Sequence, residues 1–366
     1  MSAHVQIQII AILAAMACAI PGVFLILRKM AMICDSITHT ILLGIVISFF
    51  IVQDLSSPLL VIGAALMGVL TVYLTELLNQ TNLVSEDSAI GLIFPALFSI
   101  AIIMISKFAS SVHLCIDSVF LGEIEFAPFD RLLLNGTDIG PKAMYLIGAI
   151  FIINLIFVLL FYKELKLVTF DKSEAFILGF APVALHYALM TIVSITTVGV
   201  FQAVGSILVI SFMIVPPATA YLLTNNLKRM IFYAILIGAI NSAIGHYLAI
   251  RWDVSIAGMI ATVTGIVFTI VFILSPNDGV ITNIRRRKKQ RLDFAKLSIL
   301  FHVNRHMAKD DFVEECNINT LNEHFRMNKK FINDTITELE KESMLEIKNS
   351  IAYVTDKGRD FIEAYD

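Results

Sequence analysis

The chain has 366 residues, of which 57% are hydrophobic and only 16% are charged, and its formal net charge is −3. Soluble globular proteins carry about 25% charged residues, so this composition excludes an ordinary soluble protein and predicts an integral membrane protein. The four cysteines, Cys18, Cys34, Cys115 and Cys316, are scattered without a C-x-x-C pair, which argues against a disulfide framework or a zinc cluster.

The charged residues are concentrated toward the C-terminus. Residues 292–366 contain 10 Lys/Arg and 15 Asp/Glu, whereas the much longer preceding part contains 17 and 15. We therefore predict a transmembrane domain over residues 1–280, a basic juxtamembrane linker over 281–291 and a small soluble domain over 292–366.

Eight stretches lack Asp, Glu, Lys and Arg and approach or exceed the roughly 20 apolar residues that a membrane-spanning helix needs. They are Gln8–Leu27, Ser36–Gln53, Ser57–Thr75, Ser88–Ser106, Ala143–Tyr162, Ala175–Leu227, Met230–Ile250 and Val254–Asn277. The sixth is too long for one helix, and we expect it to divide near Val198–Ala203. The sequence thus predicts an all-α polytopic membrane domain of about nine transmembrane helices, with eight as the alternative.

Basic residues in short loops predict the orientation, because cytoplasmic loops are enriched in Lys and Arg. If nine helices cross the membrane, four groups of basic residues lie on the same side of it: Arg28/Lys29, Lys163/Lys166, Lys228/Arg229 and Arg285–Lys289. We therefore expect a multi-pass protein of the cell membrane with its C-terminal domain in the cytoplasm and its N-terminus outside. Residues 107–142 would form a long outer segment with a partly re-entrant helix.

Asp35 and His39 are the ionisable pair that we single out, because charged groups within a bilayer are costly and by default indicate function. Their i, i+4 spacing places both side chains on one helical face, roughly 10–15 Å into the bilayer at about 1.5 Å per residue. A carboxylate and an imidazole suit Mn²⁺, Fe²⁺ or Zn²⁺, and two copies around a two-fold axis would supply four ligands. The alternative is a pair that only satisfies itself. Cys34 is either a soft ligand or a packing residue.

The segment after the fifth predicted span carries helix-capping signals. Asp171 can cap a helix, Glu174 can complete a capping box, Gly179 can end the helix, and Pro182 can start the next span. A short capped helix at the inner face would fit a groove on a separate ATPase, and an ordinary connector is the alternative.

Several segments, in order, resemble the manganese/zinc/iron permease family of ABC importers. The similar segments are Leu27–Met32 followed by Asp35 and His39, then Glu86–Gly91, Lys163–Gly179, Gln202–Gly205 and Pro216–Ala220. The sequence departs from the family's pattern at Cys34, which replaces a glycine, and at the bulkier run Thr40–Leu43. Pro216 and Pro217 are expected to kink or break their helix.

This resemblance covers roughly Ile7–Pro276 and implies a non-catalytic permease subunit that moves Mn²⁺, Zn²⁺ or Fe²⁺ into the cytoplasm without a permanently bound cofactor. It implies that Asp35 and His39 contact the metal. The residues implied in ATPase coupling are Phe170, Asp171, Glu174, Phe176 and Gly179. No P-loop sequence G-x-x-x-x-G-K-[ST] occurs in the chain, so ATP would be hydrolysed by a separate ATPase subunit. The other implied partners are an extracytoplasmic metal-binding protein, a second permease copy or paralogue, and membrane lipid.

The C-terminal domain has the pattern of a small α+β winged helix. We expect helices over Leu292–Met307, Ile318–Phe325 and Asn328–Ser343, then a hairpin of Leu345–Ile347 and Ala352–Val354 before a last helix opened by Thr355. The segment Leu345–Gly358 resembles the wing of iron-dependent or MarR-type repressors.

Lys329 and Lys330 are the candidates for a nucleic-acid contact, at the start of the expected recognition helix. The excess of 15 acidic over 10 basic residues disfavours that contact, because phosphate neutralisation provides most of the affinity. Protein docking or metal sensing is the preferred role. Four further side chains could bind metal but match no strong spacing pattern, so solvated surface residues are the favoured interpretation: His302, His306, Cys316 and His324.

Two other functions compete with the permease. One is a membrane-tethered, metal-responsive transcription regulator, and the other is a passive channel or secondary transporter. The acidic C-terminal domain and the predicted coupling segment favour the permease over the regulator, and the coupling segment disfavours the channel or secondary transporter.

Overall fold

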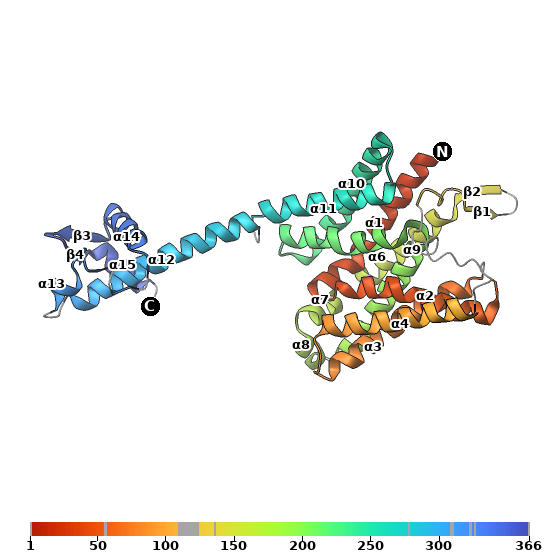
Figure 1. Cartoon of the computed structure of the whole chain (residues 1–366), viewed down its shortest axis with the longest axis horizontal. Helices are drawn as coiled ribbons and strands as arrows, with labels where there is room; N and C mark the ends of the chain where they lie inside the picture. Colours follow the sequence, from red (N-terminus) through yellow and green to blue (C-terminus); the bar gives the residue numbers. More distant parts are fainter. Residues whose placement is uncertain are drawn as a thin grey trace. The chain divides into compact units, whose positions relative to one another are not determined.

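The computed structural model describes residues 2–54, 57–108, 124–134, 137–276, 279–307, 311–321, 324–325 and 327–364. The chain forms two compact units, Met1–Gly279 and Val280–Asp366, which we call the membrane unit and the C-terminal unit. Figure 1 shows the elements of both units.

The membrane unit is built almost entirely from helices. Its elements are α1 (Ala3–Leu27), α2 (Met32–Val52), α3 (Leu59–Gln80), α4 (Glu86–Phe108), β1 (Arg131–Leu134), β2 (Thr137–Pro141), α6 (Lys142–Leu160), α7 (Tyr162–Phe170), α8 (Lys172–Ile177), α9 (Pro182–Leu223), α10 (Leu227–Trp252) and α11 (Ile256–Leu274). Eight of the described helices are long and apolar enough to cross a membrane: α1 to α4, α6, and α9 to α11.

The helix α9 explains the difference between these eight helices and the nine that the sequence predicts. With 42 residues, a straight α9 would extend about 63 Å, twice the roughly 30 Å thickness of the hydrocarbon core. Its backbone leaves the helical region at Gly205, where φ is 82° and ψ is 170°. The Thr197 hydroxyl then lies 3.9 Å from the sulfur of Met213. The chain therefore turns back at Gly205, and α9 supplies two antiparallel segments, 182–204 and 206–223.

The turn lies near Val198–Ala203, where the sequence predicts that the long apolar segment divides, so that prediction is confirmed. The helix does not break at Pro216 and Pro217, where the backbone stays helical. Pro217 has no N–H to donate to the carbonyl of Met213. The helix α1 packs directly over this carbonyl at Gly22, where an added Cβ would collide with the Met213 oxygen and lie 2.9 Å from Pro217 Cγ. Close packing against α1 thus covers the carbonyl that Pro217 leaves without a helical N–H partner, as such a backbone group within a membrane requires.

The core of the membrane unit surrounds α1, which is buried along most of its length and packs against α6, α9 and α10. The buried Asn154 of α6 donates 2.9 Å hydrogen bonds to the carbonyl of Ala17 and to the hydroxyl of Thr196. The helices α2, α3 and α4 pack side by side (Figure 1). There the Thr71 hydroxyl donates to Thr40 at 2.8 Å. Such interhelical bonds satisfy polar groups that lipid cannot solvate.

The segment after α4 contains a two-stranded antiparallel hairpin, in which Arg131 of β1 pairs with Pro141 of β2. This hairpin was not predicted. The expected re-entrant helix falls largely on residues 109–123, which lie outside the described residues.

The C-terminal unit has its own hydrophobic core. Its elements are α12 (Val280–His306), α13 (Phe312–Glu315), α14 (Lys329–Lys341), β3 (Leu345–Lys348), β4 (Ile351–Val354) and α15 (Asp356–Glu363). Side chains from α12, α14 and the β3–β4 hairpin form this core, including Leu300, Ile332 and Leu345.

Most elements predicted for this unit are confirmed. Asn328 caps α14, Thr355 caps α15, and the hairpin lies where it was expected. The helix α12 begins at Val280, so the predicted linker 281–291 is helical.

The predicted helix Ile318–Phe325 is wrong for its described residues. Residues 318–320 form turns, and the N–H of Ile318 donates to the carbonyl of Ser350 at 3.0 Å. The side chain of Asn317 accepts the N–H of Asn319 at 3.0 Å. A local side-chain acceptor of this kind competes with helix formation.

Candidate functional site

Asp35 and His39 form a pair on one face of α2. His39 Nε2 lies 3.4 Å from Asp35 Oδ1, and the two side chains are 33% and 29% exposed, respectively. Because α2 begins at Met32, Asp35 lies about 4.5 Å and His39 about 10 Å along the axis from its start. Asp35 therefore lies in the first turn of α2, where the helix dipole stabilises a carboxylate.

Aromatic side chains of α4 hold the imidazole of His39. The His39 ring stacks on Phe94 at a centroid distance of 5.5 Å and meets the edge of Phe98 at 5.9 Å. Cys34 is fully buried in the core of the membrane unit. Among the described residues, no third His, Cys, Asp or Glu joins Asp35 and His39 in a cluster of metal-binding size. One copy of the described chain therefore offers two ligands.

The predicted coupling helix is present as α8, between α7 and α9. Asp171 Oδ1 accepts the N–H of Glu174 at 2.8 Å, so the predicted cap is confirmed. At the other end Gly179 has a φ of 84°, and the N–H of Phe180 donates to the carbonyl of Ala175 at 3.1 Å. This is the glycine-ended helix terminus that the sequence predicts.

The second half of the predicted capping box is wrong. In a capping box, the Glu174 side chain would accept the N–H of Asp171. That N–H instead donates to the carbonyl of Leu167 at 2.8 Å, because Asp171 also ends α7. Glu174 lies exposed on the surface of α8.

The surface around α8 is apolar and exposed. Phe170 is 64% exposed and Phe176 is 74% exposed. Ile177 and Leu178 continue this surface, which we call the α8 patch and define as Phe170, Phe176, Ile177 and Leu178. An exposed apolar patch outside the lipid-facing helices is typical of a protein interaction site.

A polar network links the α7–α8 segment to the neighbouring helix ends. Arg28, which directly follows α1, donates from Nε to the Thr169 hydroxyl at 3.2 Å and places Nη1 3.3 Å from His186 Nδ1. His186 Nε2 lies 3.5 Å from Glu76 Oε2 near the end of α3. These residues line a cavity of about 230 Å³. The contacts of Arg28 with Thr169 and His186 were not anticipated from the sequence.

A larger cavity, of about 760 Å³, lies at the opposite end of α1. His4, Glu125 and Asp253 are among its lining residues, together with Gly205 at the turn of α9. Sequence reasoning missed this site because its residues come from four distant segments of the chain.

In the C-terminal unit, Lys329 and Lys330 lie exposed in the first turn of α14. The acidic residues farther along this helix have a structural role, because Glu338 and Glu342 contact the buried Lys296 Nζ at 3.1 and 2.8 Å. The nucleic-acid contact of Lys329 and Lys330 stays a prediction.

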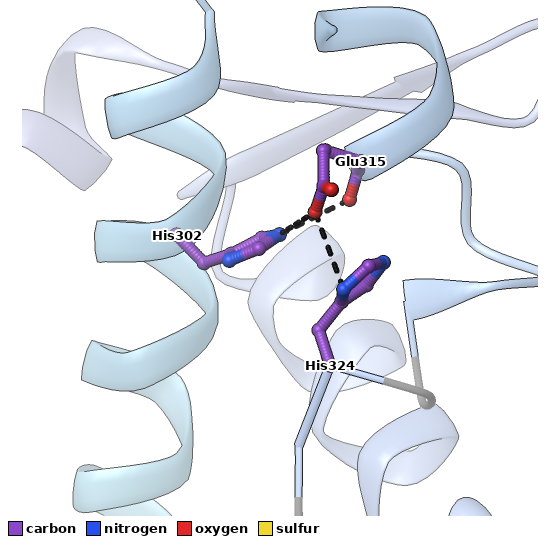
Figure 2. A group of neighbouring side chains, drawn as sticks. All are labelled: His302, Glu315 and His324. Carbon is purple, nitrogen blue, oxygen red and sulfur yellow. Dashed lines mark hydrogen bonds and ion pairs between the residues drawn. The ribbon is translucent and has the colours of Figure 1, made fainter.

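His302 and His324, two of the histidines considered as metal ligands from the sequence, lie beside Glu315, which was not considered. Glu315 Oε2 lies 3.5 Å from His302 Nε2 and 3.2 Å from His324 Nδ1 (Figure 2). Burial lowers the pKa of His302 and outweighs the opposing effect of its hydrogen bond to the Glu315 carbonyl. Cys316 points away into the core, where burial raises the pKa of its thiol to about 11.

The long apolar helices and the α8 segment define a multi-pass membrane protein with the architecture of an ABC-importer permease. The model of the ABC 3 transport family matches residues 3–275. The chain belongs to this family, which favours transport over the tethered-regulator alternative.

Named relatives agree with this family. The manganese transport system membrane protein MntD of Bacillus subtilis is 41% identical over 271 residues, covering 74% of this chain and 92% of the relative. The zinc transport system membrane protein TroD of Treponema pallidum is 37% identical over 359 residues, 98% of each chain. The similarity to TroD therefore includes the C-terminal unit.

A solved structure shows the same fold for the membrane unit. The structure of PsaBC from Streptococcus pneumoniae in complex with Fab matches with a TM-score of 0.61 and 27% identity, over 75% of this chain and 92% of that one.

Proposed function

We propose that this chain is the non-catalytic permease subunit of an importer for a divalent transition-metal ion, with Mn²⁺, Zn²⁺ and Fe²⁺ as the candidate substrates. The observation that carries this proposal is the Asp35–His39 pair, because it places two metal-binding side chains on a spanning helix. The names of the manganese and zinc transport relatives support the same class of substrate.

The metal passes between two permease subunits, and each contributes one Asp35–His39 pair. A single copy supplies two donor groups, whereas a metal of this class takes four or more. A two-fold or pseudo-two-fold axis beside α2 would bring two carboxylates and two imidazoles together. Partial exposure of both side chains leaves them accessible to such a partner.

A separate cytoplasmic ATPase docks on the α8 patch. Movement of the patch reaches the spanning helices through Thr169, which lies in the last turn of α7 and contacts Arg28. Arg28 in turn contacts His186 near the start of α9. Displacement of α8 would therefore act on α1 and α9, which pack against each other in the core.

The cavity at the opposite end of α1 receives the ion from an extracytoplasmic metal-binding protein. Its lining includes the imidazole of His4 and the carboxylates of Glu125 and Asp253. Carboxylates and imidazoles attract and transiently bind divalent cations.

The C-terminal unit lies in the cytoplasm and has a winged-helix arrangement. The order of α12, α13, α14, the β3–β4 hairpin and α15 supports this arrangement. Ser350 lies in the turn of the β3–β4 hairpin. A cysteine that replaces it, in a chain that also carries Cys115→Ser, should react with a membrane-impermeant maleimide only in inside-out vesicles. Reaction in intact cells would place the unit outside.

Reconstituted uptake tests the proposed function. The chain is placed in proteoliposomes with its ATPase and binding protein, and accumulation of Mn²⁺, Zn²⁺ and Fe²⁺ is measured with and without ATP. We expect ATP-dependent accumulation of at least one ion, and loss of ATPase co-purification in Phe176→Ala. Phe232→Ala, which removes a 61% exposed aromatic side chain from α10, is the matched control. Failure of the assembled complex to accumulate any of the three ions would contradict the proposal.

A further inference from the structure

We propose that His302, Glu315 and His324 bind one divalent first-row transition-metal ion in the C-terminal unit. This site is separate from the Asp35–His39 pair, and its existence does not depend on transport by the membrane unit. It uses side chains of three segments: α12, α13 and the short segment before α14 (Figure 2).

The spacing of the donor atoms fits a metal ion with little adjustment. Ligand atoms at about 2.1 Å from a tetrahedral metal are about 3.4 Å apart. The two contacts of Glu315 Oε2, 3.5 Å to His302 and 3.2 Å to His324, already have this length. One donor atom from each of the three residues lies within 4.8 Å of the other two. The largest separation therefore needs to shorten by about 1.4 Å at most for an ion to bind.

The donor set selects the class of ion. Two imidazole nitrogens and one carboxylate oxygen suit Zn²⁺, Mn²⁺ or Fe²⁺, whereas Mg²⁺ and Ca²⁺ prefer oxygen ligands alone. Three protein ligands also leave a coordination position for water, as in open zinc sites. The side chains are 18%, 28% and 31% exposed for His302, Glu315 and His324, so an ion can reach them from solvent.

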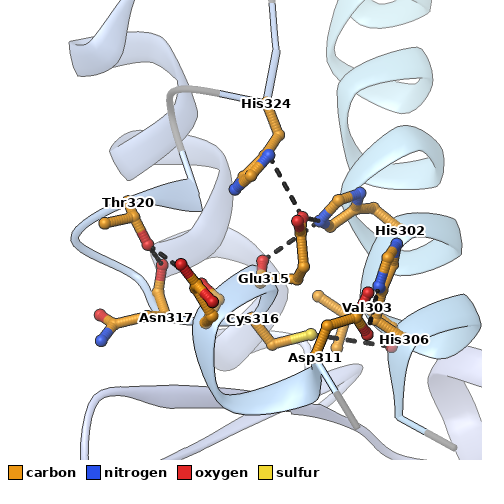
Figure 3. Close-up of polar contacts among 10 residues, drawn as sticks. His302, Val303, His306, Asp311, Glu315, Cys316, Asn317, Thr320 and His324 are labelled. Carbon is orange, nitrogen blue, oxygen red and sulfur yellow. Dashed lines mark hydrogen bonds and ion pairs between the residues drawn. The ribbon is translucent and has the colours of Figure 1, made fainter. Parts of the chain in front are cut away.

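Neighbouring rings hold the two imidazoles in place. The rings of His302 and His324 stack at a centroid distance of 5.1 Å, and His302 also meets the edge of Phe325 at 5.4 Å. The ring centroid of His302 also lies 4.8 Å from that of His306. His306 Nδ1 in turn lies 2.9 Å from Asp311 Oδ1 (Figure 3). Supporting contacts of this kind reduce the entropy lost when a ligand set closes on its metal.

Metal binding requires one proton to move on His302. Without an ion, Nε2 lies 3.1 Å from the Glu315 carbonyl and donates its proton there. In the metal-bound form the ring takes the other tautomer, with the proton on Nδ1 and the Nε2 lone pair directed at the ion. The Glu315 carboxylate keeps its charge and exchanges its contacts to the two imidazoles for one metal bond.

The ion would link segments that are distant in the sequence. It would join the C-terminal part of α12 to α13 and to the segment before α14, and so stabilise the folded C-terminal unit in proportion to the free metal concentration. The unit would thereby respond to the concentration of the ion around it.

Cobalt absorption on the full-length chain tests the site directly, because Co²⁺ with imidazole and carboxylate ligands absorbs visible light. The chain carries Asp35→Asn and His39→Gln, so that the membrane pair cannot contribute. We expect one Co²⁺ per chain with visible bands that Zn²⁺ abolishes. Glu315→Gln and His324→Gln should each weaken Co²⁺ binding by about ten-fold or more, as expected for loss of a ligand or its support.

Glu346→Gln is the matched control, since it removes the same charge from the hairpin of the same unit, where Glu346 contacts Lys348. It should bind Co²⁺ as the parent does. Equal Co²⁺ binding by Glu315→Gln, His324→Gln and Glu346→Gln would overturn the proposal, and so would the absence of a bound Co²⁺ in all of them. Because transport is not measured, neither result depends on the permease function.

Discussion

The turn of α9 depends on the backbone conformation of Gly205. Its φ of 82° and ψ of 170° lie in a region that is essentially restricted to glycine. Replacing it with alanine should cost about 1–3 kcal/mol in backbone strain. The strain acts where α9 turns back. A backbone shift that relieves the strain would move Thr197 away from Met213.

Gly265→Ala is the control for this substitution. Gly265 lies inside α11, and a Cβ added there meets nothing within 4 Å. Alanine should therefore be neutral or stabilise the helix by about 0.5–1 kcal/mol. We expect thermal unfolding of the detergent-purified protein to show a melting temperature several degrees lower for Gly205→Ala and unchanged or slightly higher for Gly265→Ala. Equal melting temperatures for the two variants would refute the assigned role of Gly205.

Three further substitutions test other parts of the account. Arg28→Met should remove the contacts to Thr169 and His186. The ATPase should still co-purify and hydrolyse ATP, but metal uptake should be lost. Lys29→Met is the control and should take up metal normally. Gly179→Ala should destabilise the end of α8 by about 1 kcal/mol, because the φ of Gly179 is 84°. It should therefore weaken ATPase binding in a pull-down titration. Lys296→Met should lower the stability of the C-terminal unit by at most about 1 kcal/mol in a denaturant titration, because the two carboxylates that lose their partner are 41% and 39% exposed and remain solvated.

Features that depend on local sequence could be predicted well. The cap at Asp171 and the glycine end at Gly179 follow from side-chain and backbone preferences of a few neighbouring residues, and both are confirmed. The hairpin and the caps of α14 and α15 follow for the same reason. The spanning helices could be located because lipid requires long uncharged segments.

Features that depend on tertiary contacts could not be predicted. The division of the long apolar segment could be predicted, but the sharp turn at Gly205 could not, because a glycine permits this backbone conformation without imposing it. In the sequence, Arg28 indicates only which loops face the cytoplasm. The fold shows that it contacts Thr169 and His186. Glu315 has no helical spacing to either His302 or His324, so no pattern could join the three residues before the fold was known.

The central claim is that Asp35 and His39 carry the transported ion. Its most direct test is ATP-dependent metal uptake by proteoliposomes containing Asp35→Asn or His39→Gln, each in correctly inserted and assembled complexes. Asp54→Asn, a carboxylate just beyond the other end of α2, is the control. The account predicts that uptake falls to the level without ATP in both test variants and stays at the wild-type level in the control. Wild-type uptake by both test variants would contradict it.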